Sequence, residues 1–334
     1  MKFCTYSNTF TEGGEFEMLS VGIICAYFGE LPGCFSCWLK SCEFNPTINF
    51  LLITDQEVNT VPKNVRVIKL SFQFVQKLAD NKIGCHVALD YPYKLCDLKP
   101  MYGIMFCDYL DKYDYWGHCD MDMVFGDIRG FLERYNFEKY EKFLDLGHLS
   151  LYKNTIENNN RFRMGGSQCG TWKEVISDPE GHAFDELNGI YQIYLKNNIP
   201  VFDKRIYADI SMLYTRFRCA LDDPNYDQQV FYWENGHIFR SYWIDGKHNI
   251  EEFIYIHFKK RNFGKQEFDV KTVNSFYIGP SGYTKKITDA TLEDVYKINP
   301  FYGEKIEKKE LSRKMKHMKI KNWKKRFKRL LNII

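Results

Sequence analysis

Two aspartates one residue apart, Asp120 and Asp122, are the strongest candidates for chemistry in the sequence. They follow an aromatic run at residues 113–119, which is typical of a strand, and precede an apolar run at 123–128. Two carboxylates at the end of a strand can face one cation, because oxygen ligands suit Mg²⁺ and Mn²⁺. The pair therefore predicts a metal site, with a solvated acidic turn as the simpler alternative.

A phosphatase of the haloacid dehalogenase type is a second interpretation of the same acids. Residues 120–124 match its D-x-D-x-[TV] pattern, with Asp120 as nucleophile and with Asp222 and Asp223 as later magnesium ligands. That motif normally ends the first strand of its domain. Here a long α/β-like stretch comes before Asp120, which argues against a phosphatase.

The elements that would position these acids alternate between strand and helix patterns. Buried strands are expected at 19–28, 48–54 and 65–70, and helices at 34–43 and from a capping Ser71 to Ile83. Further on, helices are expected at 100–110 and 184–196, and strands at 113–119, 143–152 and 253–258. Such alternation predicts an α/β fold with a mostly parallel central sheet flanked by helices. Ligands of such sheets bind at the carboxyl ends of the strands, where Asp120 would lie.

Several segments together resemble one protein family. They are YKLCDLKP at 93–100, YDYWGHCDMD at 113–122, GDI at 126–128, YFG at 27–29, TD at 54–55 and HFKKR at 257–261. These segments resemble an uncharacterised family of bacterial polysaccharide glycosyltransferases, distantly similar to glycosyltransferase families 8 and 32. The resemblance covers roughly residues 20–262 and implies the GT-A fold, a Rossmann-like fold for nucleotide-diphospho-sugar transferases.

The resemblance also implies roles for individual residues. It makes His257 the third metal ligand beside Asp120 and Asp122, an O/O/N set that favours Mn²⁺ over Mg²⁺. It implies contacts with the nucleotide, diphosphate or donor sugar for Tyr27, Asp55, Asp97, Lys99, Lys259 and Arg261. Asp185 and Glu186 match the D-Q-x-x-N element of family 8, with Glu in place of Gln, and are the candidate catalytic residues.

Some of these residues have plainer interpretations when the resemblance is set aside. His257 would be a structural histidine, Asp97 a helix N-cap before Pro100, and Lys259 with Arg261 a solvated basic turn. If the acidic pair and His257 lay apart in space, a noncatalytic glycan-binding protein would be the better hypothesis.

The function implied is that of a metal-dependent hexosyltransferase. It would move a sugar from a nucleotide-sugar, expected to be UDP-linked, to a saccharide or lipid-linked saccharide acceptor in cell-surface polysaccharide or capsule biosynthesis. The likeness to families 8 and 32 favours retention of configuration. A general base at Asp185 or Glu186 would instead give inversion.

The C-terminal segment has a charge pattern of its own. Residues 311–334 contain ten Lys and Arg and no acid, whereas the whole chain has a net charge of only +3. Apolar residues recur at steps of three and four from Ile320 to Ile334, which predicts a basic amphipathic helix. An anionic membrane surface is the expected partner of residues 311–334, with docking on protein as an alternative and no nucleic acid expected.

The remaining patterns concern organisation and location. The sequence predicts an N-terminal appendage at 1–17, a GT-A catalytic domain at 18–262, an extension packing on it at 263–303 and the basic tail at 304–334. No apolar run of 18 residues and no signal peptide is recognisable, and eleven scattered cysteines fit reduced thiols. We therefore expect a cytoplasmic protein, peripheral on the inner face of the cell membrane.

Overall fold

The computed structural model describes residues 18–220, 223–259, 261 and 268–331, with side chains described as far as Ile320. The chain forms two compact units and passes between them several times. Unit 1 comprises the residues up to Pro32, Cys42–Met121 and Ile128–Lys204, and unit 2 comprises Gly33–Ser41, Asp122–Asp127 and the residues from Arg205. The four segments expected from the sequence stay predictions, and the appendage at 1–17 lies outside the described residues.

Unit 1 is built on a seven-stranded sheet in the order β3-β2-β1-β4-β7-β6-β8. Its strands are β1 (Val21–Ala26), β2 (Ile48–Thr54), β3 (Val65–Lys69), β4 (Tyr115–Cys119), β6 (Lys142–Phe143), β7 (Leu149–Lys153) and β8 (Val201–Phe202). Strands β3, β2, β1 and β4 run parallel, β7 is antiparallel to both of its neighbours, and β6 and β8 are parallel. The prediction of an α/β fold with a mostly parallel sheet is confirmed.

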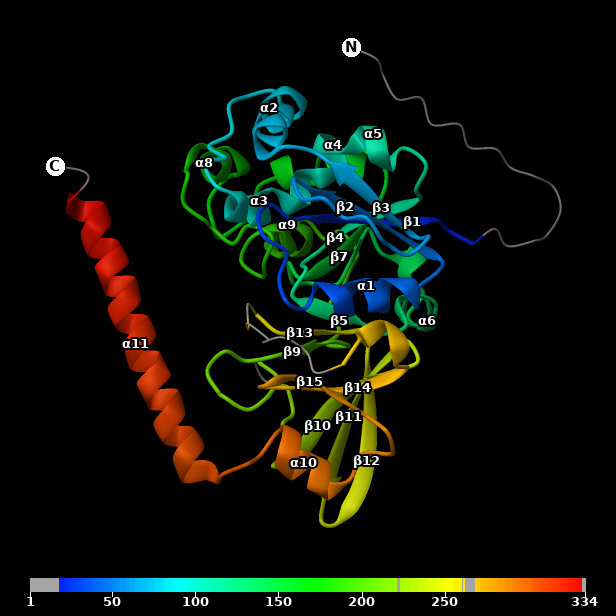
Figure 1. Ribbon diagram of the computed structural model, residues 1–334. Coiled ribbons are helices and arrows are strands. Elements are labelled where there is room, and N and C mark those ends of the chain that lie inside the picture. The colour runs from blue at the N-terminus through cyan, green and yellow to red at the C-terminus, as the bar shows by residue number, and fades with distance from the viewer. Residues whose placement is uncertain (1–17, 221–222, 260, 262–267, 332–334) are drawn as a thin grey trace. The chain divides into compact units, whose positions relative to one another are not determined.

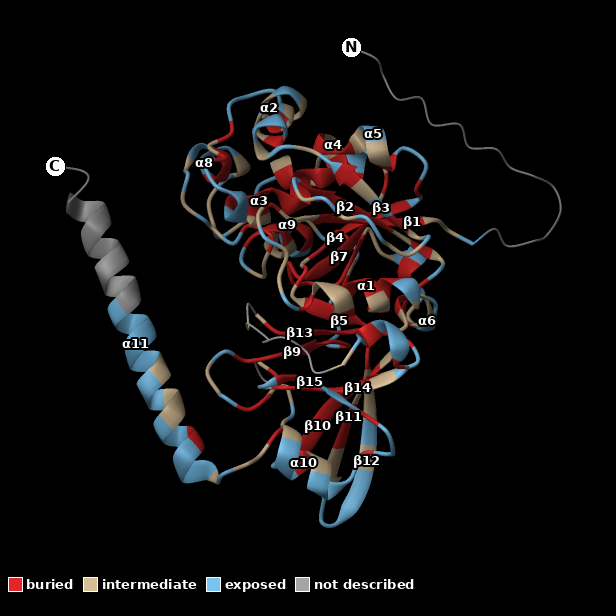
Figure 2. Cartoon of the chain, viewed as in Figure 1, coloured by how far each residue is buried: buried red, intermediate tan, exposed pale blue. Residues whose placement is uncertain are grey.

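Helices cover the sheet of unit 1, with α2, α4 and α5 on one side and α6 on the other (Figure 1). The helices are α2 (Phe72–Ile83), α3 (Leu95–Leu98), α4 (Tyr102–Met105), α5 (Cys107–Leu110), α6 (Ile128–Arg134), α7 (Ile156–Asn159), α8 (Trp172–Ser177) and α9 (Ile190–Lys196); α1 (Phe35–Glu43) has residues in both units. Ile24, Leu51 and Trp116 of the strands share one buried apolar cluster with Val75 of α2 and Met105 of α4. Figure 2 shows that the strands of this sheet are buried along most of their length.

Local signals explain several elements that the sequence predicted. Strand β2 spans the expected residues 48–54, and helix α2 begins after Ser71, whose side chain accepts a hydrogen bond from the Phe74 amide. Gly84 ends that helix in the left-handed conformation, with φ of 87°.

Other expected bounds were wrong. The helix expected at 100–110 is broken into a 3₁₀ turn (Lys99–Met101), α4 and α5. The strand expected at 143–152 is two strands, because the chain turns at Leu144, which has φ of 72°. The helix expected from 184 starts only at Ile190, since the preceding segment is a loop whose Phe184 amide bonds to Asp97.

Unit 2 contains two sheets that the sequence analysis did not foresee. A three-stranded sheet has the order β5 (Met123–Phe125), β13 (Tyr255–His257), β9 (Ala208–Asp209). An antiparallel sheet has the order β12 (Lys247–Phe253), β11 (His237–Ile244), β10 (Gln228–Glu234), β14 (Ser275–Gly279), β15 (Gly282–Lys285). Two-residue turns, Asn235-Gly236 and Asp245-Gly246, join β10 to β11 and β11 to β12, and all four residues have positive φ, as type I′ hairpins require. The single strand expected at 253–258 is therefore wrong, because β12 ends and β13 begins within it.

The C-terminal part of unit 2 is helical. Helix α10 (Leu292–Ile298) packs through Val295 against Val230 and Tyr232 of β10, and helix α11 spans Glu304–Leu331. Helix α11 starts earlier than the amphipathic pattern from Ile320, and the side chains beyond Ile320 lie outside the described residues. Within the described part of the chain, no helix combines the length and the apolar character needed to cross a bilayer.

Candidate functional site

Three predicted site residues of unit 1 follow neighbouring parallel strands. Tyr27 follows β1, Asp55 follows β2 and Asp120 follows β4. The Asp55 carboxylate accepts hydrogen bonds from the Gln56 side chain, at 2.9 Å, and from the Gly29 amide, at 3.0 Å, and these bonds lower its pKa. Parallel strands end at the same edge of a sheet, so the fold gathers these residues at the carboxyl edge, where the sequence predicted Asp120.

Lys99 joins Asp120 to Asp185 in the interior of unit 1. Its Nζ lies 2.7 Å from Asp120 Oδ1, 3.0 Å from Asp185 Oδ2 and 2.8 Å from the carbonyl oxygen of Gly147. The lysine comes from the 3₁₀ turn before α4, Asp120 from the end of β4 and Asp185 from the loop before α9. We call Lys99, Asp120, Asp185 and Gly147 the Lys99 cluster.

Burial sets the charges of this cluster. Burial alone would lower the pKa of Lys99, but the Asp120 and Asp185 carboxylates outweigh it and raise the pKa well above that of an exposed lysine. Burial raises the pKa of Asp185, although the Lys99 ammonium opposes that shift. Lys99 is therefore a permanent cation built into the site.

Gly147 allows the close approach on which this geometry depends. A Cβ atom at this position would lie 2.3 Å from Asp185 Oδ2, so a side chain here would force Asp185 to shift. The Gly147 amide also donates a hydrogen bond to Glu186 Oε2 at 3.4 Å. Asp185 is buried and Glu186 only partly so, which makes Glu186 the more accessible of the two predicted catalytic residues.

Asp97 has a role in the fold that the sequence did not reveal. It lies inside α3 and does not cap the helix that begins near Pro100, so the N-cap interpretation was wrong. Its buried carboxylate accepts hydrogen bonds from Lys94 Nζ at 2.8 Å and from the amides of His182 and Phe184 at 2.9 Å. Asp97 thus fixes the loop that delivers Asp185, and its contact with a donor sugar stays a prediction.

A second group of polar residues lies within unit 2, on the three-stranded sheet. His257 Nδ1 lies 3.0 Å from Asp209 Oδ1, and His257 Nε2 lies 3.4 Å from Asp122 Oδ1. Lys259 Nζ lies 2.5 Å from Asp209 Oδ2. We call Asp122, Asp209, His257 and Lys259 the His257 cluster.

The pairing of short strands assembles this cluster. His257 of β13 lies opposite Asp209 of β9 in the parallel register, while Asp122 precedes β5 and accepts a hydrogen bond from the Phe258 amide through its backbone oxygen. The sequence analysis missed Asp209, because a two-residue strand has no periodic pattern and only the sheet register places it beside His257.

The surroundings of His257 suit a metal ligand. Asp209 is almost fully buried and its Oδ1 lies beside Nδ1 of His257, while Nε2 lies on the side of Asp122. Histidines that bind metals usually have their second nitrogen held in this way by a carboxylate. The described residues thus include Asp and His clusters that could hold a metal ion.

Lys259 and Arg261 do not form a solvated basic turn. Lys259 adopts a left-handed conformation, with φ of 54°, and its ammonium binds Asp209. The Arg261 guanidinium donates hydrogen bonds to the carbonyl oxygens of Ser211 and Tyr214, at 2.7 and 2.8 Å. Contact of either residue with a diphosphate stays a prediction.

The predicted ligands Asp120 and Asp122 belong to different units and are joined through Met121. Of the residues that the phosphatase interpretation requires later in the chain, Asp223 lies in unit 2, and Asp222 lies outside the described residues.

Residues 23–287 match the model of a protein family of unknown function, DUF6625. The chain belongs to this family. The matched residues run from before Tyr27 to beyond Arg261, so every predicted site residue lies within the family's span. No curated protein matches the chain.

Proposed function

We propose that this member of DUF6625 is a metal-dependent glycosyltransferase of the GT-A type. It would transfer a sugar from a nucleotide-sugar, expected to be UDP-linked, to a saccharide or lipid-linked saccharide acceptor. The observation that carries the proposal is the orientation of His257, whose Nδ1 contacts the buried Asp209 while Nε2 faces Asp122. Histidines that bind metals usually have one nitrogen held by a carboxylate in this way.

The order of strands in unit 1 supports a nucleotide-binding role. In the sequence β3-β2-β1-β4, the chain starts at β1, builds outward to β3, and returns to the other side of β1 with β4. Open α/β sheets bind ligands at the carboxyl ends of strands where the order reverses in this way. Tyr27 and Asp120 follow the two strands at that point, and Asp55 follows the next strand.

Asp122 and His257 would hold the cation, and Asp120 is the expected third ligand. Two residues along an extended chain span at most about 7 Å, so the D-x-D spacing itself brings Asp120 within reach of a cation at Asp122. When bound, Mn²⁺ or Mg²⁺ would stabilise the charge that develops on the diphosphate leaving group. The mixed nitrogen and oxygen ligands favour Mn²⁺.

The Lys99 cluster would position Asp120. The Lys99 ammonium fixes Oδ1 of Asp120, so that the carboxylate keeps one orientation before any ligand arrives. Glu186 is partly exposed and is the residue that we expect to position the acceptor, without acting as a general base. A retaining reaction remains part of the proposal.

The alternatives have less support. A phosphatase would need Asp120 as an attacking carboxylate at the end of the first strand, whereas Asp120 follows the fourth strand along the chain and pairs with Lys99. A noncatalytic glycan-binding protein gives no reason for a carboxylate of the D-x-D pair to lie 3.4 Å from a buried histidine.

A screen of nucleotide-sugars for Mn²⁺-dependent hydrolysis tests the proposal. We expect hydrolysis of at least one UDP-sugar, lost on addition of a chelator, and abolished in Asp120→Ala, Asp122→Ala and His257→Ala with the circular dichroism spectrum unchanged. Asp111→Ala, which removes an exposed aspartate from the same unit as Asp120, is the matched control and should retain full activity. Full activity of Asp122→Ala would refute the metal site.

A further inference from the structure

The first turns of helix α11 hold the loop that follows Asp209. Glu307 Oε1 lies 2.5 Å from Nε of Arg216, and the other oxygen of this carboxylate binds Arg218. Glu310 accepts a hydrogen bond from the Thr215 hydroxyl, and Lys314 Nζ donates to the Met212 carbonyl oxygen at 3.2 Å. These contacts recur at three- and four-residue steps, so one face of α11 lies along the loop at residues 211–218.

The same loop is attached to the His257 cluster. It begins two residues after Asp209, and a bridge between Ile210 and Cys219 closes it. Arg261, four residues after His257, donates hydrogen bonds to the Ser211, Tyr214 and Thr215 carbonyl oxygens. Thr215 thus receives contacts from both sides, through its hydroxyl from α11 and through its carbonyl from Arg261. The 211–218 loop therefore connects α11 to the strands β9 and β13 through direct contacts.

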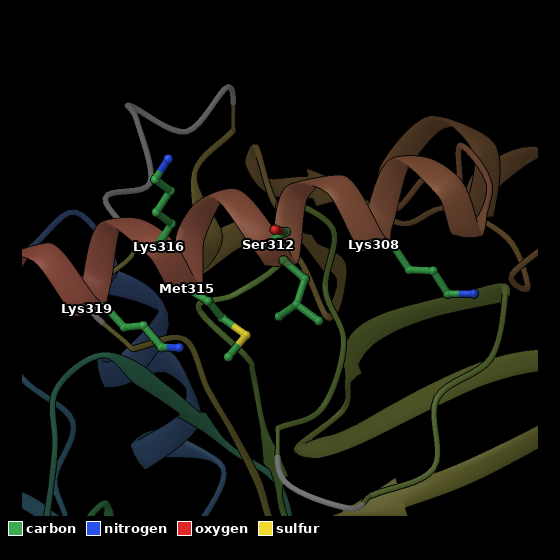
Figure 3. Close-up of a pocket in the computed structure, with 6 residues that line it drawn as sticks. Lys308, Ser312, Met315, Lys316 and Lys319 are labelled. Atoms are coloured by element: carbon green, nitrogen blue, oxygen red, sulfur yellow. The ribbon is translucent and has the colours of Figure 1, made fainter.

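Another face of α11 is exposed and combines apolar with basic side chains. Its members follow steps of three and four residues and are Lys308, Leu311, Ser312, Met315 and Lys319. Figure 3 shows Lys308, Met315 and Lys319 on one side of the helix and Lys316 on the opposite side. Met315 and Met318 are about half exposed, at 44% and 52%. We call Lys308, Leu311, Ser312, Met315 and Lys319 the basic face.

The chemistry of the basic face fits an anionic lipid surface. Residues 311–334 carry ten basic residues and no acid, which attracts the helix to anionic headgroups. The exposed apolar side chains among the lysines, Met315 and Met318, suit insertion between lipid headgroups, which nucleic-acid phosphates would not provide.

We propose that α11 binds an anionic bilayer through the basic face and thereby strengthens divalent cation binding at the His257 cluster. A helix held on a membrane would fix the positions of Glu307 and Glu310, and these residues would hold the 211–218 loop in the arrangement that supports Asp209 and His257. The second step rests on the proposed metal site. Membrane binding itself does not.

Vesicle sedimentation of the full chain tests the first step. We expect binding to vesicles of phosphatidylglycerol and phosphatidylcholine and none to phosphatidylcholine alone. One variant carries two substitutions on the basic face, Lys308→Gln and Lys319→Gln, and a matched control loses the same charge elsewhere in unit 2, through Lys247→Gln and Lys285→Gln. The first should bind about tenfold or more weakly and the control as the wild type does. Equal binding of the two variants would overturn the proposal, as would release from vesicles by duplex DNA that depends on the same two lysines.

Titration of Mn²⁺, with free ion followed by electron paramagnetic resonance, tests the second step. Anionic vesicles should tighten Mn²⁺ binding of the wild type about fivefold. Glu307→Gln should bind vesicles normally without this gain. Glu304→Gln is the control, because Glu304 is on the same turn but pairs only with the exposed Lys308 in the described contacts.

A second variant tests the same contact in case Glu307→Gln does not fold. Thr215→Val removes the hydroxyl that Glu310 binds and leaves both arginines paired, so it should lose part of the gain while keeping the wild-type unfolding temperature. An Mn²⁺ affinity that vesicles leave unchanged would overturn the coupling alone. Vesicle binding by a protein without any Mn²⁺ affinity would overturn the coupling together with the metal site.

Discussion

The Lys99 cluster and the His257 cluster share one plan and differ in one component. In each cluster a nitrogen-containing side chain lies between two carboxylates, one buried and one partly exposed. The buried acids are Asp185 and Asp209, with side chains 4% and 2% exposed, and the partly exposed ones are Asp120 and Asp122, at 26% and 21%. The nitrogen-containing side chain is a lysine in unit 1 and a histidine in unit 2.

This difference decides what each cluster can bind. Lys99 supplies a built-in positive charge that already neutralises part of the two acids. The His257 imidazole lies between Asp209 and Asp122, so its Nε2 and the Asp122 carboxylate are a pair of candidate ligands. We infer that the Lys99 cluster fixes the orientation of Asp120 and that the His257 cluster would supply the nitrogen ligand of the proposed metal site.

Replacing the built-in cation should have the largest effect on stability. Lys99→Met leaves the buried Asp185 without its partner, and we expect the free energy of unfolding to fall by about 3 to 5 kcal/mol. Urea unfolding followed by circular dichroism measures the change.

The matched control is Lys82→Met, which breaks a pair with Asp108 whose carboxylate is 64% exposed. It should cost only about 0 to 1 kcal/mol. If the two variants lose the same stability, Lys99 does not stabilise the buried Asp185 more than an exposed ion pair would, and the proposed difference between the clusters is wrong.

Asp209→Asn should have a smaller effect, confined to metal binding. The amide cannot match the charge with which Asp209 orients His257 and binds Lys259, so we expect Mn²⁺ affinity to fall about 10- to 100-fold. Calorimetric titration with Mn²⁺ measures it, with Asp289→Asn, an exposed acid of the same unit, as the control. If Asp209→Asn binds Mn²⁺ with wild-type affinity, Asp209 does not orient His257 for metal binding, and the proposed difference between the clusters is wrong.

The sequence allowed prediction of the parts of both clusters that local patterns mark. Strand β2 at 48–54 and the Ser71 cap came from apolar runs and helix-start signals, and the D-x-D pair was visible as a motif. The two hairpins of unit 2 were equally predictable in principle, because Asn235-Gly236 and Asp245-Gly246 are strong turn signals between β-prone runs.

The contacts that complete each cluster could not be predicted in this way. Lys99 and Asp185 are 86 residues apart, and Asp209 and His257 are 48 residues apart. No periodicity connects such positions. Only the register of short strands and the hydrogen bonds of Asp97 to the 182–184 loop bring them together.

The smallest expected effect concerns the protonation of Asp185. Burial raises its pKa in the folded state, so between about pH 4, the ordinary value for an aspartate, and the raised value the folded protein binds more protons than the unfolded chain. Stability should therefore decrease as pH rises through this window, by about 1 kcal/mol per pH unit, and Asp185→Asn should flatten the decrease. Urea unfolding of both proteins at several pH values measures the slopes. If stability instead rises with pH in the wild type and not in the variant, pairing with Lys99 outweighs burial, and the Lys99 cluster holds two ionised acids as a metal site would.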